Sequence, residues 1–120
     1  MNAVAPFPRL LAASGAIDCS IAVGLGAWAM HAAVSPHDQQ RLAIAALFLF
    51  LHGLALATLA PAGGSRLRQT GLGLLLAATI LFSGSLACAA VFGIEPRLAP
   101  IGGSSAMLGW LLVAAGFVRR

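Results

Sequence analysis

The chain has 120 residues, of which 60% are apolar and 8% are charged, and its formal net charge is +4. A water-soluble domain normally carries about 25% charged residues, so this composition excludes an ordinary soluble fold. The positive charge does not indicate a nucleic-acid partner, because the arginines are scattered at the ends of apolar blocks and form no basic stripe. We expect the lipid bilayer to be the main partner.

Four apolar blocks follow one another, at about residues 10–33, 42–60, 71–93 and 101–118. Each is close to the roughly 20 residues that a helix needs to cross hydrocarbon about 30 Å thick. The blocks lack the alternation of a membrane strand. We therefore expect an all-α fold, a single domain over residues 1–120 with four transmembrane helices.

The prolines and the connections support this division. Six prolines lie between or beside the blocks, namely Pro6, Pro8, Pro36, Pro61, Pro96 and Pro100. Proline disrupts a helix interior but is tolerated in the first turn, where Pro100 is expected to open the fourth helix. The three connections are short, so neighbouring helices should run antiparallel in an up-down-up-down bundle.

The arginines predict the orientation. The N-terminus, the second connection and the C-terminus together hold Arg9, Arg66, Arg68, Arg119 and Arg120. The first and third connections hold one each, Arg41 near Asp38 and Arg97 near Glu95. Because cytoplasmic loops collect positive residues, both termini are expected in the cytoplasm.

The first block has features of its own near its outer end. Trp28 is expected at the membrane interface and His31 in solvated surroundings. Ala27-Trp28-Ala29 loosely matches a signal-peptide cleavage site, but the block is longer than a usual signal-peptide core. We keep it as a membrane span, with cleavage as the alternative.

A buried polar layer is the sharpest hypothesis for a site. Asp18 is the only acid inside a block, and such residues usually face other helices. Counting about 1.5 Å per residue places Asp18, His52 and Thr79 at one depth, about 12 Å from the cytoplasmic end. The layer is either a site for protons or solutes or a buried hydrogen bond that fixes helix register, and the second reading is favoured.

Stripes of small residues predict close helix packing. In the first block Asp18 lies on such a stripe, which comprises Gly15, Cys19, Ala22, Gly26 and Ala29. The third helix is expected to pack through Gly73, Ala77, Gly84 and Cys88, and the fourth through Gly102, Ser105, Gly109 and Gly116. Cys19 and Cys88 differ in depth by about 12 Å, which excludes a disulfide within one molecule.

Several short motifs follow one another along the chain. They are Gly26 and His31 in the first block, then Leu81-Phe82-Ser83-Gly84-Ser85-Leu86, Pro100-Ile101-Gly102-Gly103 and Gly109-Trp110. In order and spacing the chain resembles the small membrane-protein family catalogued as domain of unknown function 423. The resemblance implies a four-helix bacterial inner-membrane protein and carries no established activity. Asp18 is not part of the family pattern.

Three classes of function remain to be weighed. A structural or accessory membrane protein explains the glycine stripes and the short connections. A small proton-coupled transporter would use the Asp18 and His52 layer, and it is the alternative. An intramembrane enzyme is not expected, because no nucleophile and base share a depth. No cofactor or metal site is indicated, and a homo-oligomer or another membrane protein is a possible partner.

Overall fold

The structure is a computed structural model that describes residues 5–119. It contains four α-helices, α1 (Pro6–His31), α2 (Pro36–Leu59), α3 (Arg66–Phe92) and α4 (Ala99–Val118), and residues 5–119 form no strand. Each helix is long and apolar enough to cross a membrane. The all-α prediction and the four membrane-spanning helices are therefore confirmed.

The first three helices begin four to six residues before the apolar blocks. Pro6 and Pro36 each lie in a first helical turn, where the missing N–H costs nothing. Ser35 caps α2, because its hydroxyl accepts a 3.1 Å hydrogen bond from the Asp38 N–H. Ser65 caps α3 in the same way. These polar first turns lengthen the helices, so the connections shrink to residues 32–35, 60–65 and 93–98.

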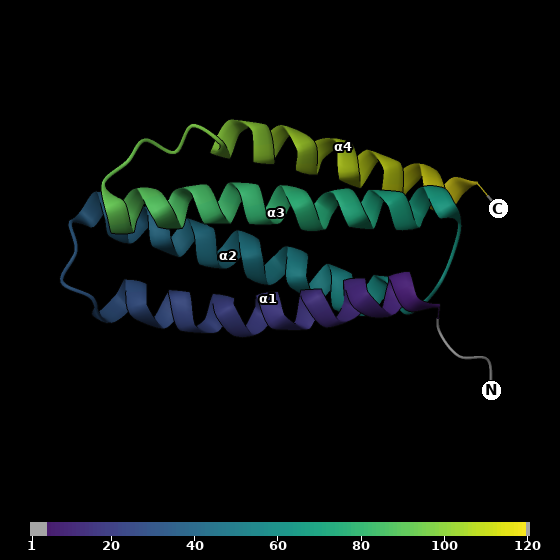
Figure 1. Cartoon of the computed structure of the whole chain (residues 1–120), viewed down its shortest axis with the longest axis horizontal. Helices are drawn as coiled ribbons and strands as arrows, with labels where there is room; N and C mark the ends of the chain where they lie inside the picture. Colours follow the sequence, from purple (N-terminus) through teal and green to yellow (C-terminus); the bar gives the residue numbers. More distant parts are fainter. Residues whose placement is uncertain (1–4, 120) are drawn as a thin grey trace.

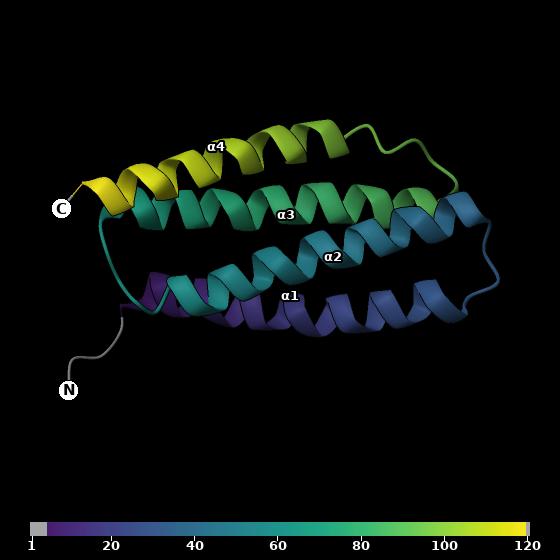
Figure 2. The same cartoon turned by 180° about the vertical axis from the view of Figure 1, so that it is seen from behind.

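Consecutive helices run antiparallel, as the short connections predict. Figures 1 and 2 show the helices running back and forth, with the start of α1 and the end of α4 at the same end of the molecule. Gly93 ends α3 with a φ of 67°, a conformation that glycine adopts without strain. It turns the chain toward α4.

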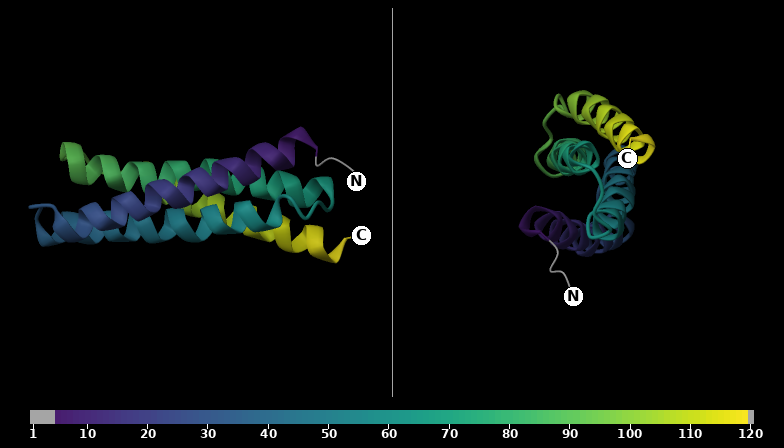
Figure 3. Two further views of the ribbon diagram at one scale, coloured as in Figure 1. Left: turned by 90° about the horizontal axis from the view of Figure 1, so that it is seen from below. Right: turned by 90° about the vertical axis from the view of Figure 1, so that its right-hand side faces the viewer.

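The four helices form an open row rather than a closed bundle. Within the described residues α1 packs on α2, α2 on α3 and α3 on α4, with a slight contact between α1 and α3. The backbones of α1 and α4 do not approach one another. The end-on view in Figure 3 shows these two helices at opposite edges. One side of α1 and one side of α4 therefore remain uncovered.

Glycines set the two closest helix–helix contacts. Gly15 of α1 faces Gly53 of α2, and a Cβ added to Gly53 would come within 2.6 Å of the Gly15 carbonyl oxygen. On the other side, a Cβ added to Gly102 would come within 2.6 Å of the Phe82 backbone nitrogen. Gly109 likewise faces Gly71. The missing side chains let backbones touch, which is how membrane helices associate when lipid offers no hydrophobic driving force.

The packing stripe expected on the fourth helix is confirmed at three positions, and the one expected on the third is wrong. Gly102, Gly109 and Gly116 are all buried. On α3, a Cβ at Gly84 would have nothing within 4 Å, and Cys88 is exposed. The face of α3 that meets α4 carries Gly71, Leu75 and Ala78 instead.

Candidate functional site

Asp18 lies near the middle of α1 and is 7% exposed. The Gly15–Gly53 contact brings α1 so close to α2 that a Cβ on Gly53 would stand 2.9 Å from the Asp18 Cβ. The prediction that this carboxylate faces another helix rather than lipid is therefore confirmed. Its depth is also as expected, because Gly53 adjoins His52 in the sequence.

The Asp18 side chain lines a groove of about 260 Å³. Three helices contribute to this Asp18 groove, which is lined by Asp18, Ile21, Leu25, Leu49, Ile80, Ser83, Gly84 and Ala87. Only two of these residues, Asp18 and Ser83, are polar. Since α1 and α3 contact one another only slightly, the groove lies where the helix packing is thinnest.

One carboxylate oxygen of Asp18 has no partner. Its Oδ2 atom is buried and makes no hydrogen bond with any residue in the described range 5–119. The hydroxyl of Ser83 does not serve it, because that group donates to the Ala45 carbonyl oxygen at 2.9 Å. Leaving a buried charged or polar group without a partner costs at least about 1–3 kcal/mol. The groove thus has apolar walls, and the Asp18 side chain that lines it holds a buried acceptor whose bonding capacity is unused.

The predicted pairing of Asp18 with His52 is wrong. The His52 Nδ1 atom lies 2.8 Å from the Phe48 carbonyl oxygen, and its Nε2 atom accepts a 3.0 Å hydrogen bond from the indole N–H of Trp110. A neutral imidazole with its proton on Nδ1 satisfies both contacts at once. Both ring nitrogens are therefore engaged on the side of α2 that faces away from Asp18.

Helix geometry explains this error. Successive residues of an α-helix are rotated by about 100°, so when Gly53 faces α1, the neighbouring His52 must turn elsewhere. The His52 ring instead joins a row of aromatic side chains that stack between the helices. Phe48 lies 4.0 Å from the His52 ring and 4.1 Å from the Phe82 ring, measured between centroids. Through Trp110 this aromatic row joins α4 to α2 although their backbones are apart.

Thr79, the third member of the expected layer, is fully buried in α3. Its hydroxyl has no hydrogen-bond partner among the described residues. Thr79 stands one helical turn before Ser83, whose hydroxyl reaches α2, so both lie on the face of α3 toward α2. The three residues of the expected layer therefore lie in different surroundings. Asp18 lines the groove, Thr79 is buried on the face of α3 toward α2, and His52 belongs to the aromatic row.

The other residues singled out in the sequence are either exposed near a helix end or form local ion pairs. Trp28 and His31 are exposed near the end of α1. Two arginines pair with the acids that stand near them in the sequence, Arg41 with Asp38 at 3.4 Å and Arg97 with Glu95 at 3.2 Å.

Both cysteines, Cys19 and Cys88, are free, in agreement with the predicted absence of a bridge between them.

The family-motif residues spread over the helix contacts. A Cβ added to Gly26 would lie 3.7 Å from the Ala46 Cβ atom. Pro100 lies in the first turn of α4. Gly103 makes only ordinary contact with the Phe82 ring, whereas its neighbour Gly102 is tightly packed. Ser85 lines a shallow hollow together with the connection between α3 and α4. Most of these motif residues therefore contribute to contacts between helices.

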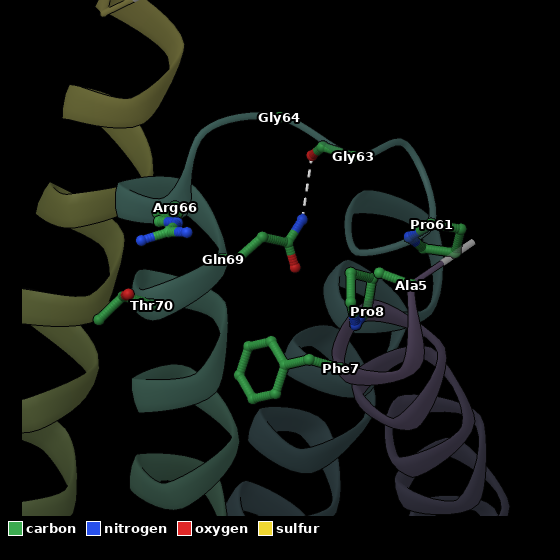
Figure 4. A pocket seen from close by; sticks show the side chains of 9 residues that line it. All are labelled: Ala5, Phe7, Pro8, Pro61, Gly63, Gly64, Arg66, Gln69 and Thr70. Carbon is green, nitrogen blue, oxygen red and sulfur yellow. Dashed lines mark hydrogen bonds between the residues drawn. The ribbon is translucent and has the colours of Figure 1, made fainter. Parts of the chain in front are cut away.

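A larger pocket, which the sequence analysis does not predict, lies at the end of the molecule where α1 and α3 begin. The pocket has a volume of about 580 Å³. Figure 4 shows the residues that line it, which come from the start of α1, the 60–65 turn and the start of α3. The Gln69 amide donates to the Gly63 carbonyl oxygen at 3.0 Å, and the Arg68 guanidinium donates to the same oxygen. Gly63 and Gly64 both have positive φ, so the Gly-Gly pair was the available signal for a sharp turn.

Ser83 donates to a backbone carbonyl, and His52 bonds Phe48 and Trp110, so these two side chains do not form a serine–histidine pair. Within residues 5–119 no three His, Cys, Asp or Glu side chains come together as a metal site. Among the residues that line the groove, Asp18 is the one that carries a titratable group.

Comparison with known proteins gives one family match. A family model described as a protein of unknown function (DUF423) matches residues 25–103, about two thirds of the chain. Asp18 lies before the matched range, whereas His52, Thr79 and Ser83 lie within it. No curated protein matches the chain significantly. No solved structure does so either.

Proposed function

We propose, from the premise that this chain belongs to the DUF423 family of proteins of unknown function, that it is a structural or accessory component of the bacterial inner membrane. The supporting observation is a second stripe of small residues on α1, on its uncovered side. These residues are Ala13, Ala16, Ser20 and Gly24, and all four are exposed. Small residues spaced by three and four let another membrane helix approach closely, so this side suits a partner protein.

Site-specific photo-crosslinking tests the accessory function. A photoreactive residue replacing Ser20 should give one discrete protein adduct in native membranes, identified by mass spectrometry. The same residue at Met107, which is exposed on α4, is the control and should react mainly with lipid. Gly24→Leu should abolish the Ser20 adduct. Equal labelling at both positions would contradict a partner at this face, and an adduct with a second copy would identify a homo-oligomer.

A small proton-coupled transporter is the second candidate, and one observation favours it. The Asp18 carboxylate lines a groove, and its Oδ2 atom has no hydrogen-bond partner among residues 5–119. In such a transporter a carboxylate takes up a proton and a cationic solute in turn. With His52 bonded elsewhere, Asp18 alone would carry the coupling. Cells whose resistance to toxic cations depends on export by this protein should lose that resistance when Asp18 is replaced by Asn. Unchanged growth and unchanged uptake would remove this candidate.

We also propose that the protein is not an enzyme. The engaged hydroxyl of Ser83 and the engaged imidazole of His52 support this proposal. Reaction of the wild type with a serine-directed probe, lost in His52→Ala, would overturn it.

A further inference from the structure

We propose that the Asp18 groove binds a small organic cation with an apolar body, of the class of aryl quaternary ammonium ions. The inference deepens the transporter candidate by naming its ligand class, but it concerns binding alone and does not require transport.

The charge of the ligand follows from Asp18. The side chain is more than nine-tenths buried, it lines the groove, and its Oδ2 atom has no hydrogen-bond partner in the described chain. The residues that share the groove bring no cation and no free donor, since Ser83 is bonded to Ala45. An ionised carboxylate in such surroundings needs a compensating positive charge, because charges buried in a membrane are paired. A ligand cation supplies it.

The apolar body follows from the walls. Ile21 and Leu25 come from α1, Leu49 from α2 and Ile80 from α3, so the carboxylate stands among aliphatic side chains. A strongly hydrated ion such as an alkali metal would find few oxygen ligands there. A quaternary ammonium ion has no N–H groups to satisfy, and its carbon substituents bury favourably against these walls.

The size of the ligand follows from the groove volume and from the open space beside Gly84, which lines the groove. A Cβ at this position would have nothing within 4 Å, so the groove is open there. Its volume of about 260 Å³ lies just below the roughly 300–1,000 Å³ of drug-sized sites. One aromatic ring with a trimethylammonium group is a suitable size. Because α1 and α3 contact only slightly, the ligand would reach the groove from the lipid between these two helices.

The probe is benzyltrimethylammonium, titrated calorimetrically into the purified full chain in lipid nanodiscs. Wild-type protein should bind it saturably, with about one ion per chain. Asp18→Asn should weaken binding at least tenfold. Gly84→Leu, which adds a bulky side chain to the wall of the groove and leaves the carboxylate in place, should weaken it by a similar factor. Asp38→Asn removes the same charge from the exterior, where Asp38 pairs with Arg41, and should change the affinity less than twofold.

The outcomes separate this inference from the functions proposed above. Circular dichroism and a single elution peak establish that each variant folds; if Asp18→Asn does not, Gly84→Leu carries the test. Equal binding by wild type and both groove variants would overturn the inference, as would binding of benzenesulfonate at equal strength. Absence of binding would also overturn it. Native mass spectrometry would then show whether a lipid or a second copy stays bound to the chain instead. Saturable binding without uptake would support the site and remove the transporter.

Discussion

At the residue scale, His52 shows how a polar side chain can be satisfied inside a membrane without a charged partner. Its ring bonds the carbonyl one turn earlier in its own helix and the indole of Trp110. It also stacks on Phe48. These contacts leave no ring nitrogen for Asp18. The histidine therefore acts as a packing residue that joins α2 to α4, and the lone carboxylate is left as the chemically unusual group.

The bond between Trp110 and His52 should contribute measurably to stability. Trp110→Phe keeps the aromatic surface and removes the N–H, so the free energy of unfolding should fall by about 0.6–1.7 kcal/mol, the range for hydrogen bonds between membrane helices. Unfolding in mixed micelles measures it. Trp28→Phe is the matched control, since Trp28 lies exposed near the end of α1, and it should cost less than half as much. Equal losses would show that the indole bond contributes nothing.

Counting residues predicted the depth of the polar groups but not their direction. Depth depends only on the rise per residue, so Asp18 does lie level with the neighbour of His52. Direction depends on which face of each helix meets its neighbour. The burial of Asp18 was predictable because small residues flank it at helical spacing. The bond of His52 to Trp110 was not, because a rotation of about 100° separates the two faces of α2 concerned.

At the element scale, glycine positions decide how the helices pair. All four helices are apolar on most of their circumference, so hydrophobicity cannot mark the packed face as it does in soluble proteins. Small residues mark it instead, and they are ambiguous when a helix has two such stripes. On α4 there was one stripe and the prediction held. On α3 the uncovered Gly84 and Cys88 were chosen, and Gly71 was missed.

Substituting a packed glycine should separate α4 from α3. A Cβ at Gly102 already collides with the backbone of Phe82, so Gly102→Leu forces the helices apart. Overpacking of this kind costs about 1–3 kcal/mol, which should appear as a lower midpoint of thermal unfolding in detergent. Gly24→Leu is the control, because nothing lies within 4 Å of that position. A Gly24 variant as unstable as the Gly102 variant would contradict this packing.

At the scale of the whole molecule, the open row distinguishes this chain from a closed four-helix bundle. The order of the helices and their antiparallel course were predictable, because short connections permit little else. Whether α1 closes on α4 was not, since no loop constrains that pair and both helices can face lipid. The open edge beside α1 exposes the small-residue stripe, and the thin contact between α1 and α3 accommodates the Asp18 groove.

Cysteine accessibility tests most directly the central claim, that four helices cross the membrane with both termini in the cytoplasm. Cys19 and Cys88 are first replaced by Ala, and a single cysteine is then placed in each connection, as Ser35→Cys, Gly63→Cys or Glu95→Cys. A membrane-impermeant maleimide should label the Ser35 and Glu95 variants in intact spheroplasts, and the Gly63 variant only after the membrane is permeabilised. Labelling of all three from outside, or of Ser35 and Glu95 from opposite sides, would contradict the account.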